Sequence, residues 1–263
     1  MSIARFQLFE FNDLADAPAS LRDSIVESLG RTLRWGRVFD RLTAPFETFL
    51  AEAGTRDVLD IASGSGDPAA ILVAAIRKQG GVPPHFHLTD LHPRVEAWEA
   101  VRASAPDDID FVRGPVDATA VPDELARGRA RVVLNALHHL PPTLAQEVLL
   151  DGIRRGAGVF IAEGFERNPL GFLPLWLPGG AALLANPLLT KKSRLEKVAL
   201  TWLTPAVVLA GLWDGFVSTL RVYTEAELRE MVAPVASSTN WTYGTFDYPF
   251  GGRGYFFYGT RKA

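Results

Sequence analysis

Five short apolar runs, separated by segments with helical spacing, span residues 57–163 and constrain the fold more than any other feature of the sequence. The runs are residues 58–61, 86–89, 110–112, 131–134 and 159–162. Because apolar residues dominate each run, the pattern is typical of parallel strands that are covered on both faces. Strands that alternate with helices indicate an α/β fold, here a Rossmann-like, doubly wound and mostly parallel sheet.

The sequence before these runs predicts helices. Apolar residues recur at helical spacing over residues 19–53, which predicts an N-terminal helical segment covering residues 1–54. Residues 55–263 are then expected to form one domain that contains the sheet, with a helical cap inserted at about residues 168–217.

The sequence after the cap predicts one more helix and two more strands. Thr224 and Glu227 have the spacing of a capping box and predict a helix over residues 224–232. Two β-like stretches follow, residues 241–248 and 254–260, with a turn-forming Pro-Phe-Gly-Gly between them. They predict an antiparallel strand pair at the end of the sheet.

Composition excludes several classes of protein. The chain is 48% apolar and 22% charged, which is ordinary for a globular domain. Its formal net charge of −3 argues against a nucleic-acid substrate, and the absence of cysteine excludes disulfides, thiolate catalysis and cysteine-ligated zinc. Residues 1–16 lack the apolar core of a signal peptide, so we expect a cytoplasmic protein.

A glycine-rich turn follows the first apolar run. Residues 58–68 read Val-Leu-Asp-Ile-Ala-Ser-Gly-Ser-Gly-Asp-Pro, so a strand leads through Gly64 and Gly66 into a helix. Glycines let the backbone turn tightly and approach a ligand closely. Asp60 precedes the first glycine by four residues, where its carboxylate can face the ammonium group of an amino-acid ligand. An ordinary strand-turn-helix is the alternative interpretation.

Polar residues also follow the next three runs. Asp90 ends the second run, where an acid can accept hydrogen bonds from ribose hydroxyls. Asp117 lies in the loop after the third run, where it can accept a hydrogen bond from the amine of adenine. Asn135 ends the fourth run, and His138 and His139 follow it.

Taken in order, these pieces resemble the class I S-adenosylmethionine-dependent methyltransferases over residues 57–163. In that family the first motif holds the methionine end of the cofactor, and the acids after strands two and three bind ribose and adenine. The segment after strand four borders the transferred methyl group. The cofactor-binding residues that the resemblance implies are Asp60, Ser63, Gly64, Gly66, Asp90, Leu91, Asp117, Ala118 and Asn135.

One departure from the motif bears on the choice of cofactor. The third small residue of the motif is replaced here by Asp67 and Pro68. An NAD-binding motif requires a third glycine at this point, so the replacement weakens an NAD interpretation more than the methyltransferase one. Residues 7–13 and 213–218 resemble a bacterial branch of the same superfamily. That branch has no secure substrate known to us, so the resemblance supplies fold and cofactor only.

The two histidines after the fourth run are candidates for contact with the methyl acceptor. A histidine titrates near neutral pH, so His138 or His139 can act as a base, and the alternative is a histidine that anchors the loop. We expect His85, His87 and His92 to be ordinary loop or strand residues. Five scattered histidines do not predict a metal site.

Asp214 interrupts an apolar stretch, where a carboxylate is costly unless it is paired or faces a pocket. Arg221 follows seven positions later, so a structural ion pair between the two is one interpretation. The alternative is that Asp214, Arg221 and Tyr223 line the polar end of the substrate pocket. The candidate catalytic residues are therefore His138, His139, Asp214, Arg221 and Tyr223.

The inserted cap is strongly apolar. Residues 170–189 are long enough to resemble a membrane span, but Pro174, Pro178, Gly179, Gly180 and Pro187 argue against a regular one. We expect a helical cap over the substrate site, with a patch that docks on anionic membranes or a homodimer face as alternatives. The basic link that suggests the membrane patch is Lys191, Lys192, Arg194 and Lys197. The side chains expected to contact ligand are some of Phe172, Leu175, Trp176, Leu203, Leu209 and Trp213.

Together these features predict methyl transfer from S-adenosylmethionine to a lipophilic small molecule, such as a natural-product or quinone-like compound, with S-adenosylhomocysteine as product. The sequence leaves open which atom is methylated. One alternative keeps the fold and cofactor but catalyses a non-methylating reaction such as a cyclisation. Another is a non-catalytic binding or regulatory protein, against which the intact motif set argues.

Overall fold

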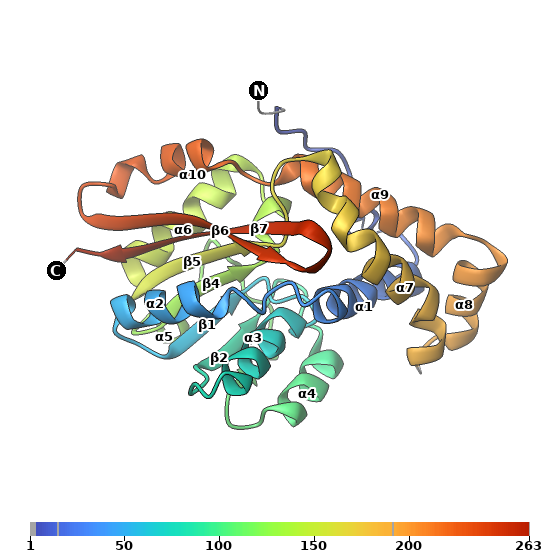
Figure 1. Ribbon diagram of the computed structural model, residues 1–263. Helices are drawn as coiled ribbons and strands as arrows, with labels where there is room; N and C mark the ends of the chain where they lie inside the picture. Colours follow the sequence, from blue (N-terminus) through green and yellow to red (C-terminus); the bar gives the residue numbers. More distant parts are fainter. Residues whose placement is uncertain (1–3, 15, 191, 263) are drawn as a thin grey trace.

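A seven-stranded sheet runs through the molecule (Figure 1) in the computed structural model, which describes residues 4–14, 16–190 and 192–262. The strand order is β3-β2-β1-β4-β5-β7-β6, and β7 alone runs antiparallel to its neighbours. The strands are β1 (Asp57–Ile61), β2 (His85–Thr89), β3 (Ile109–Phe111), β4 (Ala130–Leu134), β5 (Gly158–Glu163), β6 (Thr239–Tyr248) and β7 (Gly252–Arg261). The predicted α/β fold with an antiparallel C-terminal pair is confirmed.

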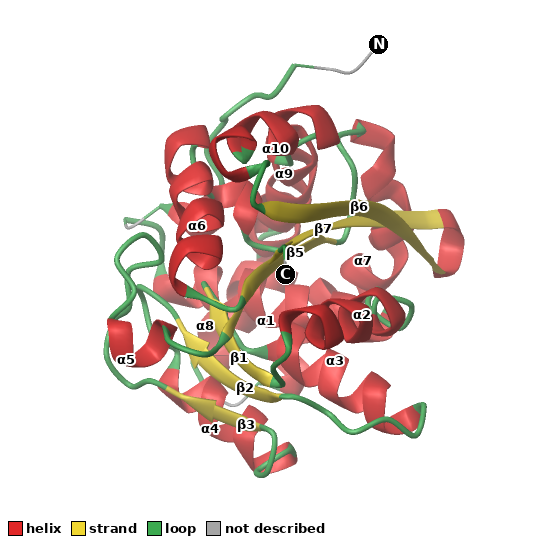
Figure 2. Ribbon diagram, turned by 90° about the vertical axis from the view of Figure 1, so that its left-hand side faces the viewer, coloured by secondary structure: helices red, strands yellow, loops and turns green. Residues whose placement is uncertain are grey.

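Helices cover both faces of this sheet, and Figure 2 shows α6 on one face and α2 with α3 on the other. The helices are α1 (Ala19–Trp35), α2 (Thr43–Ala53), α3 (Asp67–Lys78), α4 (Val95–Ser104), α5 (Asp123–Ala126), α6 (Pro142–Arg155), α7 (Leu173–Leu189), α8 (Arg194–Val198), α9 (Ala206–Arg221) and α10 (Glu225–Met231). Every residue of β4 and β5 is buried, which explains their uninterrupted apolar runs. Aromatic rings fill the space between α2 and the sheet, where Phe46 packs against both Phe86 and Phe160.

Local signals fixed the start of α10. The Thr224 side chain accepts from the backbone N–H of Glu227, and the Glu227 carboxylate accepts from the backbone N–H of Thr224. The predicted capping box is therefore confirmed.

The cap lies between β5 and α10 and consists of α7, α8, a short π-helical segment (Ala199–Leu203) and α9. The N-terminal helix α1 packs against both α7 and α9, so it contributes to the cap, while α2 packs against the sheet. A separate apolar cluster joins Leu21 and Ile25 of α1 to Leu183 of α7 and Val207 of α9.

The prolines and glycines of the first apolar stretch do not interrupt its helix. The helix α7 continues from Leu173 to Leu189 with Pro178 and Pro187 inside it. Both prolines are buried, and the packing of α7 against α1 offsets the hydrogen bonds that the prolines cannot donate. By length and composition, Leu170–Leu189 could cross a membrane, although 33% of its most apolar window is buried within the protein. Arg194–Leu203 and Ala206–Arg221 would pass the same test only as one span bent by 78°.

The basic link between the apolar stretches contains one buried lysine and one lysine near an acidic side chain. Lys197 is fully buried, with its Nζ atom 2.8 Å from Oε1 of Glu27 and 3.0 Å from Oγ1 of Thr190. The Nζ atom of Lys192 lies 3.6 Å from a carboxylate oxygen of Glu96. Lys191 lies outside the described residues. Among the described residues of the link, only Arg194 has no carboxylate oxygen within 4.0 Å.

Candidate active site

A cleft opens at the carboxyl ends of β1, β2 and β4, and we refer to it as the glycine-loop cleft. Its wall includes the turn after β1, with Ala62, Ser63 and Gly64, together with Asp90 and Asn135. Ala62 has φ of 55° and Asn135 has φ of 55°, which is the left-handed region that non-glycine residues seldom adopt. Such backbone strain is concentrated where structures hold ligands, and here both strained residues line the same cleft.

Asp60 lies beneath the floor of this cleft. The side chain is buried, and neither carboxylate oxygen has a hydrogen-bond partner within the described part of the chain. Burial, together with the nearby Asp90, raises the pKa of Asp60 to about 8. A buried carboxyl group without partners is costly, and an ammonium group in the cleft, directly or through water, would offset that cost. The residues present therefore fit the methionine end of the cofactor that the sequence implies.

Asp90 ties the turn after β1 to the end of β2. One carboxylate oxygen accepts from the backbone N–H of Gly64 at 3.0 Å, and the other accepts from that of His92 at 2.8 Å. Its backbone oxygen accepts from the N–H of Val116, which connects the loop after β3 to the same cleft. Asp90 is thus placed to position the glycine turn as well as to meet a ribose.

The other predicted cofactor residues differ in their placement. Gly66 is the N-cap residue of α3 and has φ of 79°, and a Cβ atom there would lie 2.8 Å from a methyl carbon of Leu88. Packing therefore requires this glycine. Leu91 is exposed, and Asp117 accepts from the backbone N–H and hydroxyl of Thr119, which lower its pKa. Leu91, Asp117 and Ala118 lie outside the set of described residues that line the cleft.

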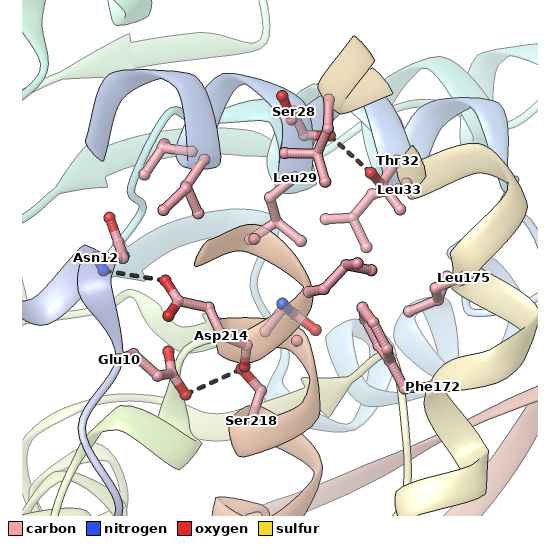
Figure 3. Close-up of a pocket in the computed structure, with 18 of the residues that line it drawn as sticks. Glu10, Asn12, Ser28, Leu29, Thr32, Leu33, Phe172, Leu175, Asp214 and Ser218 are labelled. Carbon is pink, nitrogen blue, oxygen red and sulfur yellow. Dashed lines mark hydrogen bonds between the residues drawn. The ribbon is translucent and has the colours of Figure 1, made fainter. Parts of the chain in front are cut away.

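A second cavity, the apolar pocket, lies between α1, α7 and α9 (Figure 3). Most of its wall is apolar, with Leu29, Phe172 and Leu175 among its side chains. Polar groups gather at one end, where Figure 3 shows Glu10, Asp214 and Ser218 close together. The histidines after β4, His138 and His139, line the same cavity. The two cavities are adjacent, because six residues line both: Asn12, Val26, Leu29, Leu33, Asn135 and His139.

The cap residues expected to meet ligand divide into two groups. Phe172, Leu175 and Trp176 line the apolar pocket. Leu209 and Trp213 line a separate groove with Phe9 and Phe11 on the outer side of α9. Leu203 is 79% exposed. Of the cap residues expected to meet ligand, only those at the start of α7 and just before it line the apolar pocket.

His138 lines the apolar pocket and is buried. Its Nδ1 atom lies 2.8 Å from Oε2 of Glu163, and its backbone N–H donates to Oε1 of the same residue. Because an ionised carboxylate can only accept, the proton of a neutral His138 ring resides on Nδ1. The Nε2 atom is then free to accept a proton at the polar end of the apolar pocket.

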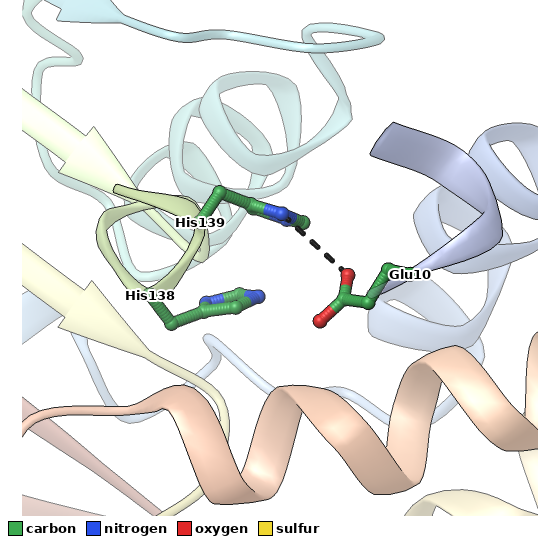
Figure 4. A group of neighbouring side chains, drawn as sticks. All are labelled: Glu10, His138 and His139. Carbon is green, nitrogen blue, oxygen red and sulfur yellow. Dashed lines mark ion pairs between the residues drawn. The ribbon is translucent and has the colours of Figure 1, made fainter. Parts of the chain in front are cut away.

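His139 has different surroundings, although it is the next residue (Figure 4). Its Nδ1 atom lies 3.0 Å from an oxygen of Asp13 and 3.5 Å from one of Glu10. Burial by itself lowers the pKa of His139, but Glu10 and Asp13 outweigh it and raise the pKa to about 9. His139 is therefore cationic at neutral pH and is not a base there.

The three side chains in Figure 4 also offer one ligand atom each within 4.8 Å of one another, so their number and type could hold a metal ion. A histidine must be neutral to bind a metal, and the raised pKa of His139 favours the ion pair with Glu10 and Asp13 instead.

The suggested ion pair between Asp214 and Arg221 was wrong. Asp214 accepts from the backbone N–H groups of Phe11 and Asn12, at 2.7 and 3.0 Å. Burial, with Glu10 and Asp13 nearby, raises the pKa of Asp214 to about 6. Only Asp214 of the three residues in the alternative interpretation is among the described residues of the pocket wall.

Arg221 and Tyr223 act behind that wall. Arg221 pairs with Asp13 at 2.6 Å and with Glu10 at 3.3 Å. The Tyr223 hydroxyl donates to the backbone oxygen of Leu140 at 2.6 Å, and the guanidinium of Arg5 lies over the tyrosine ring.

Sequence reasoning missed the N-terminal segment as part of the site. Residues 5–13 bind across the polar end of the pocket through Arg5, Glu10 and Asp13. Glu10 is almost fully buried and accepts from the hydroxyl of Ser218. The signals in the sequence were a pair of acids in a short stretch rich in phenylalanine and the resemblance of residues 7–13 to a bacterial branch of the superfamily, and neither reveals the distant partners of these acids.

Comparison with known proteins supports the fold. No family model matches the sequence, and no curated protein matches it. A candidate O-methyltransferase from Nostoc punctiforme aligns with a TM-score of 0.51 and 12% identity, over 98% of this chain and 64% of that one. The methyltransferase domain of bacterial CtHen1 aligns with a TM-score of 0.50 and 12% identity, over 86% of this chain and 100% of that one. The chain thus has the fold of the class I S-adenosylmethionine-dependent methyltransferases, as its motifs indicated.

Proposed function

We propose that the protein transfers a methyl group from S-adenosylmethionine to a small, largely apolar molecule. The observation that carries the proposal is that the glycine-loop cleft and the apolar pocket adjoin at Asn135 and His139. A cofactor in the first cavity and an acceptor in the second would meet beside His138. Holding two reactants in line is the main task of such a site and can lower a barrier by about 7–11 kcal/mol at most.

The residues around the glycine-loop cleft would hold the cofactor, which supplies an electrophilic methyl group when bound. Asp60 would compensate the ammonium group, while Ser63, Gly64 and Asp90 line the cleft beside it. Asn135 is held at the boundary because its side-chain oxygen accepts from the backbone N–H of Gly164 at 3.0 Å. Placement of adenine by Asp117 remains part of the proposal, with the loop after β3 as its support.

The pocket suggests the kind of acceptor. An apolar body would pack against Phe172 and Leu175, with a hydroxyl or similar polar group at the end near His138. We propose that Nε2 of His138 accepts the proton of that group while Glu163 holds the ring and stabilises its cationic form. The nearby acids Glu10 and Asp214 disfavour an anionic acceptor at this end.

A binding experiment tests the cofactor half of the proposal. Calorimetry should show that S-adenosylhomocysteine binds the protein and that NADH does not. Replacing Asp90 with alanine should weaken that binding, because each charge-assisted hydrogen bond contributes about 1.5–3 kcal/mol. Asp110→Ala is the matched control, because Asp110 is a partly exposed acid on β3 outside the cleft. Binding of NADH without binding of S-adenosylhomocysteine would contradict the proposal.

Turnover separates methyl transfer from the alternatives. Incubation with S-adenosylmethionine and hydroxylated aromatic compounds should yield S-adenosylhomocysteine and a methylated product, detected by mass spectrometry. Consumption of an acceptor without loss of the methyl group would indicate a non-methylating enzyme of the same fold. Cofactor binding without turnover of any acceptor seen bound in the apolar pocket would indicate a binding or regulatory protein.

A further inference from the structure

Two histidines and an aspartate meet at the amino-terminal ends of β1 and β2, away from the glycine-loop cleft at the other ends of these strands. Asp57 begins β1, and it is the register partner of His85, which begins β2. His87 lies two residues further along β2, so its side chain projects on the same face as that of His85. The sequence alone gave no reason to group these residues, because 28 positions separate Asp57 from His85 (85 − 57).

Three lone-pair-bearing atoms converge in this cluster. The Nε2 atom of His87 lies 2.7 Å from Oδ1 of Asp57 and 3.0 Å from Nδ1 of His85. The Nδ1 atom of His85 lies 3.7 Å from the same Asp57 oxygen. One imidazole nitrogen offers a single proton or a single lone pair, so Nε2 of His87 cannot form two well-directed hydrogen bonds. A cation between the three atoms satisfies all of them at once.

The carboxylate is also oriented for such a cation. Arg129 donates from Nε to Oδ2 of Asp57 at 3.0 Å, which leaves Oδ1 facing the histidines. The guanidinium is itself held by the backbone oxygens of Glu124 and Leu125. Hydrogen bonds that fix the free oxygen of a ligating carboxylate are a regular feature of protein metal sites.

We propose that Asp57, His85 and His87 form a binding site for a divalent transition-metal ion, with zinc as the best fit. Zinc binds imidazole nitrogen and carboxylate oxygen at about 2.0–2.2 Å, which places tetrahedral ligand atoms roughly 3.3–3.5 Å apart. The observed separations of 2.7, 3.0 and 3.7 Å lie on both sides of that value. All three side chains are partly exposed, so water can complete the coordination.

An ion at this site would connect two neighbouring strands of the sheet. The site joins the first residues of β1 and β2, the strands whose other ends form the glycine-loop cleft. An ion that binds the folded chain and not the unfolded one raises the melting temperature as its concentration increases. The site is independent of methyl transfer, because none of its residues lines either cavity in the described part of the chain.

Metal titration of the untagged, chelator-treated protein tests the proposal. Calorimetry should show one zinc ion bound per chain, with a rise in melting temperature, and cobalt should give the visible absorption of a tetrahedral site. Loss of a residue that only orients a metal ligand costs about 10–100-fold in metal affinity. His85 and His87 would bind the ion directly, so His85→Gln and His87→Gln should each lower the affinity for zinc by about 100-fold or more. His92→Gln, on the exposed turn after β2, should bind zinc like the wild type.

The variants also distinguish this site from the group at the apolar pocket. Circular dichroism would confirm that His85→Gln, at a partly exposed position, keeps the fold. No zinc binding by the wild type would overturn the proposal. So would unchanged affinity in both folded variants, or a loss of zinc binding in His138→Gln alone, which would place the ion beside Glu10 and His139 instead.

Discussion

The Nδ1 atom of His138 lies 2.8 Å from Oε2 of Glu163, and both side chains are buried. The two residues reach each other because β4 and β5 are adjacent parallel strands, with Leu134 in register with Ala162. Glu163 ends β5, while His138 lies in the turn that follows β4. This pair determines which ring nitrogen faces the pocket, and the first prediction depends on it.

Glu163→Gln should lower kcat by about 10²–10⁴-fold, the usual contribution of a general base. The glutamine oxygen would still accept from the backbone N–H of His138, so its amide nitrogen would donate to Nδ1 and move the ring proton to Nε2. His138→Ala should be similarly slow, and both variants should bind S-adenosylhomocysteine almost as tightly as the wild type. Glu166→Gln, three residues away and outside the pocket, is the control. Full activity of both variants with the true acceptor would show that His138 only anchors its loop.

Asp60 should release a proton when the cofactor binds. Its pKa is about 8 in the free protein, and an ammonium group nearby would lower that value. Calorimetry of S-adenosylhomocysteine at pH 7, in buffers of different ionisation enthalpy, should show proton release that Asp60→Asn abolishes. Equal enthalpies in all buffers would contradict this coupling.

The same group makes a prediction about stability. The native pKa of Asp60, about 8, lies above the unfolded value of 3.8, so the native state binds more protons between these values. The contribution of Asp60 to stability should therefore fall as pH rises from about 4 to about 8. Urea unfolding of the cofactor-free protein should show a smaller decrease over this range for Asp60→Asn than for the wild type.

The ion pair between His139 and Asp13 should anchor the N-terminal segment in a defined pH window. The native pKa of His139 is about 9 and the unfolded value is 6.5, so its contribution is complete below 6.5 and disappears as pH rises through 9. His139 and Arg221 hold the pKa of Asp13 well below its ordinary value. The contribution of the Asp13 carboxylate to stability is therefore complete above that ordinary pKa and is lost only in strong acid.

Hydrogen exchange of residues 5–13 measures this anchoring. Protection, after correction for the intrinsic rate, should be greater at pH 7 than at pH 10. Asp13→Asn should lose much of the pH 7 protection, whereas the exposed Asp16→Asn should behave like the wild type. Equal protection at both pH values would show that Arg221 and the backbone bonds suffice.

The width of the apolar pocket should depend on Gly215. A methyl group at this position would overlap the ring of Phe172, which lines the same pocket. Gly215→Ala should therefore displace the ring and raise KM for the acceptor, with little change in cofactor affinity. Gly114→Ala is the control, because a methyl group there meets no atom within 4 Å and Gly114 is not among the residues that line the pocket. An unchanged KM in Gly215→Ala would place the acceptor elsewhere.

The sequence predicted the elements of the cofactor side better than those of the acceptor side. Ser63, Gly64, Asp90 and Asn135 follow strands whose order in the sheet is typical of the fold, so their convergence follows from topology. The partners of Asp214 and Arg221 were predicted wrongly because a spacing of seven residues shows only that they can share a helix face. Their actual partners, Phe11, Asn12 and Asp13, lie about 200 positions away in the sequence.

What the sequence determined by itself was local: which segments are strands or helices, where α10 begins, and that a glycine turn follows β1. Apolar periodicity and capping report these features because they arise from contacts between residues a few positions apart. Only the tertiary structure decided that Glu163 orients His138, that Glu10 and Asp13 keep His139 charged, and that Asp57 meets the histidines of β2. Each of these three contacts depends on which elements become neighbours and in what register. Burial of the whole core determines that arrangement, so no local pattern of residues predicts the contacts.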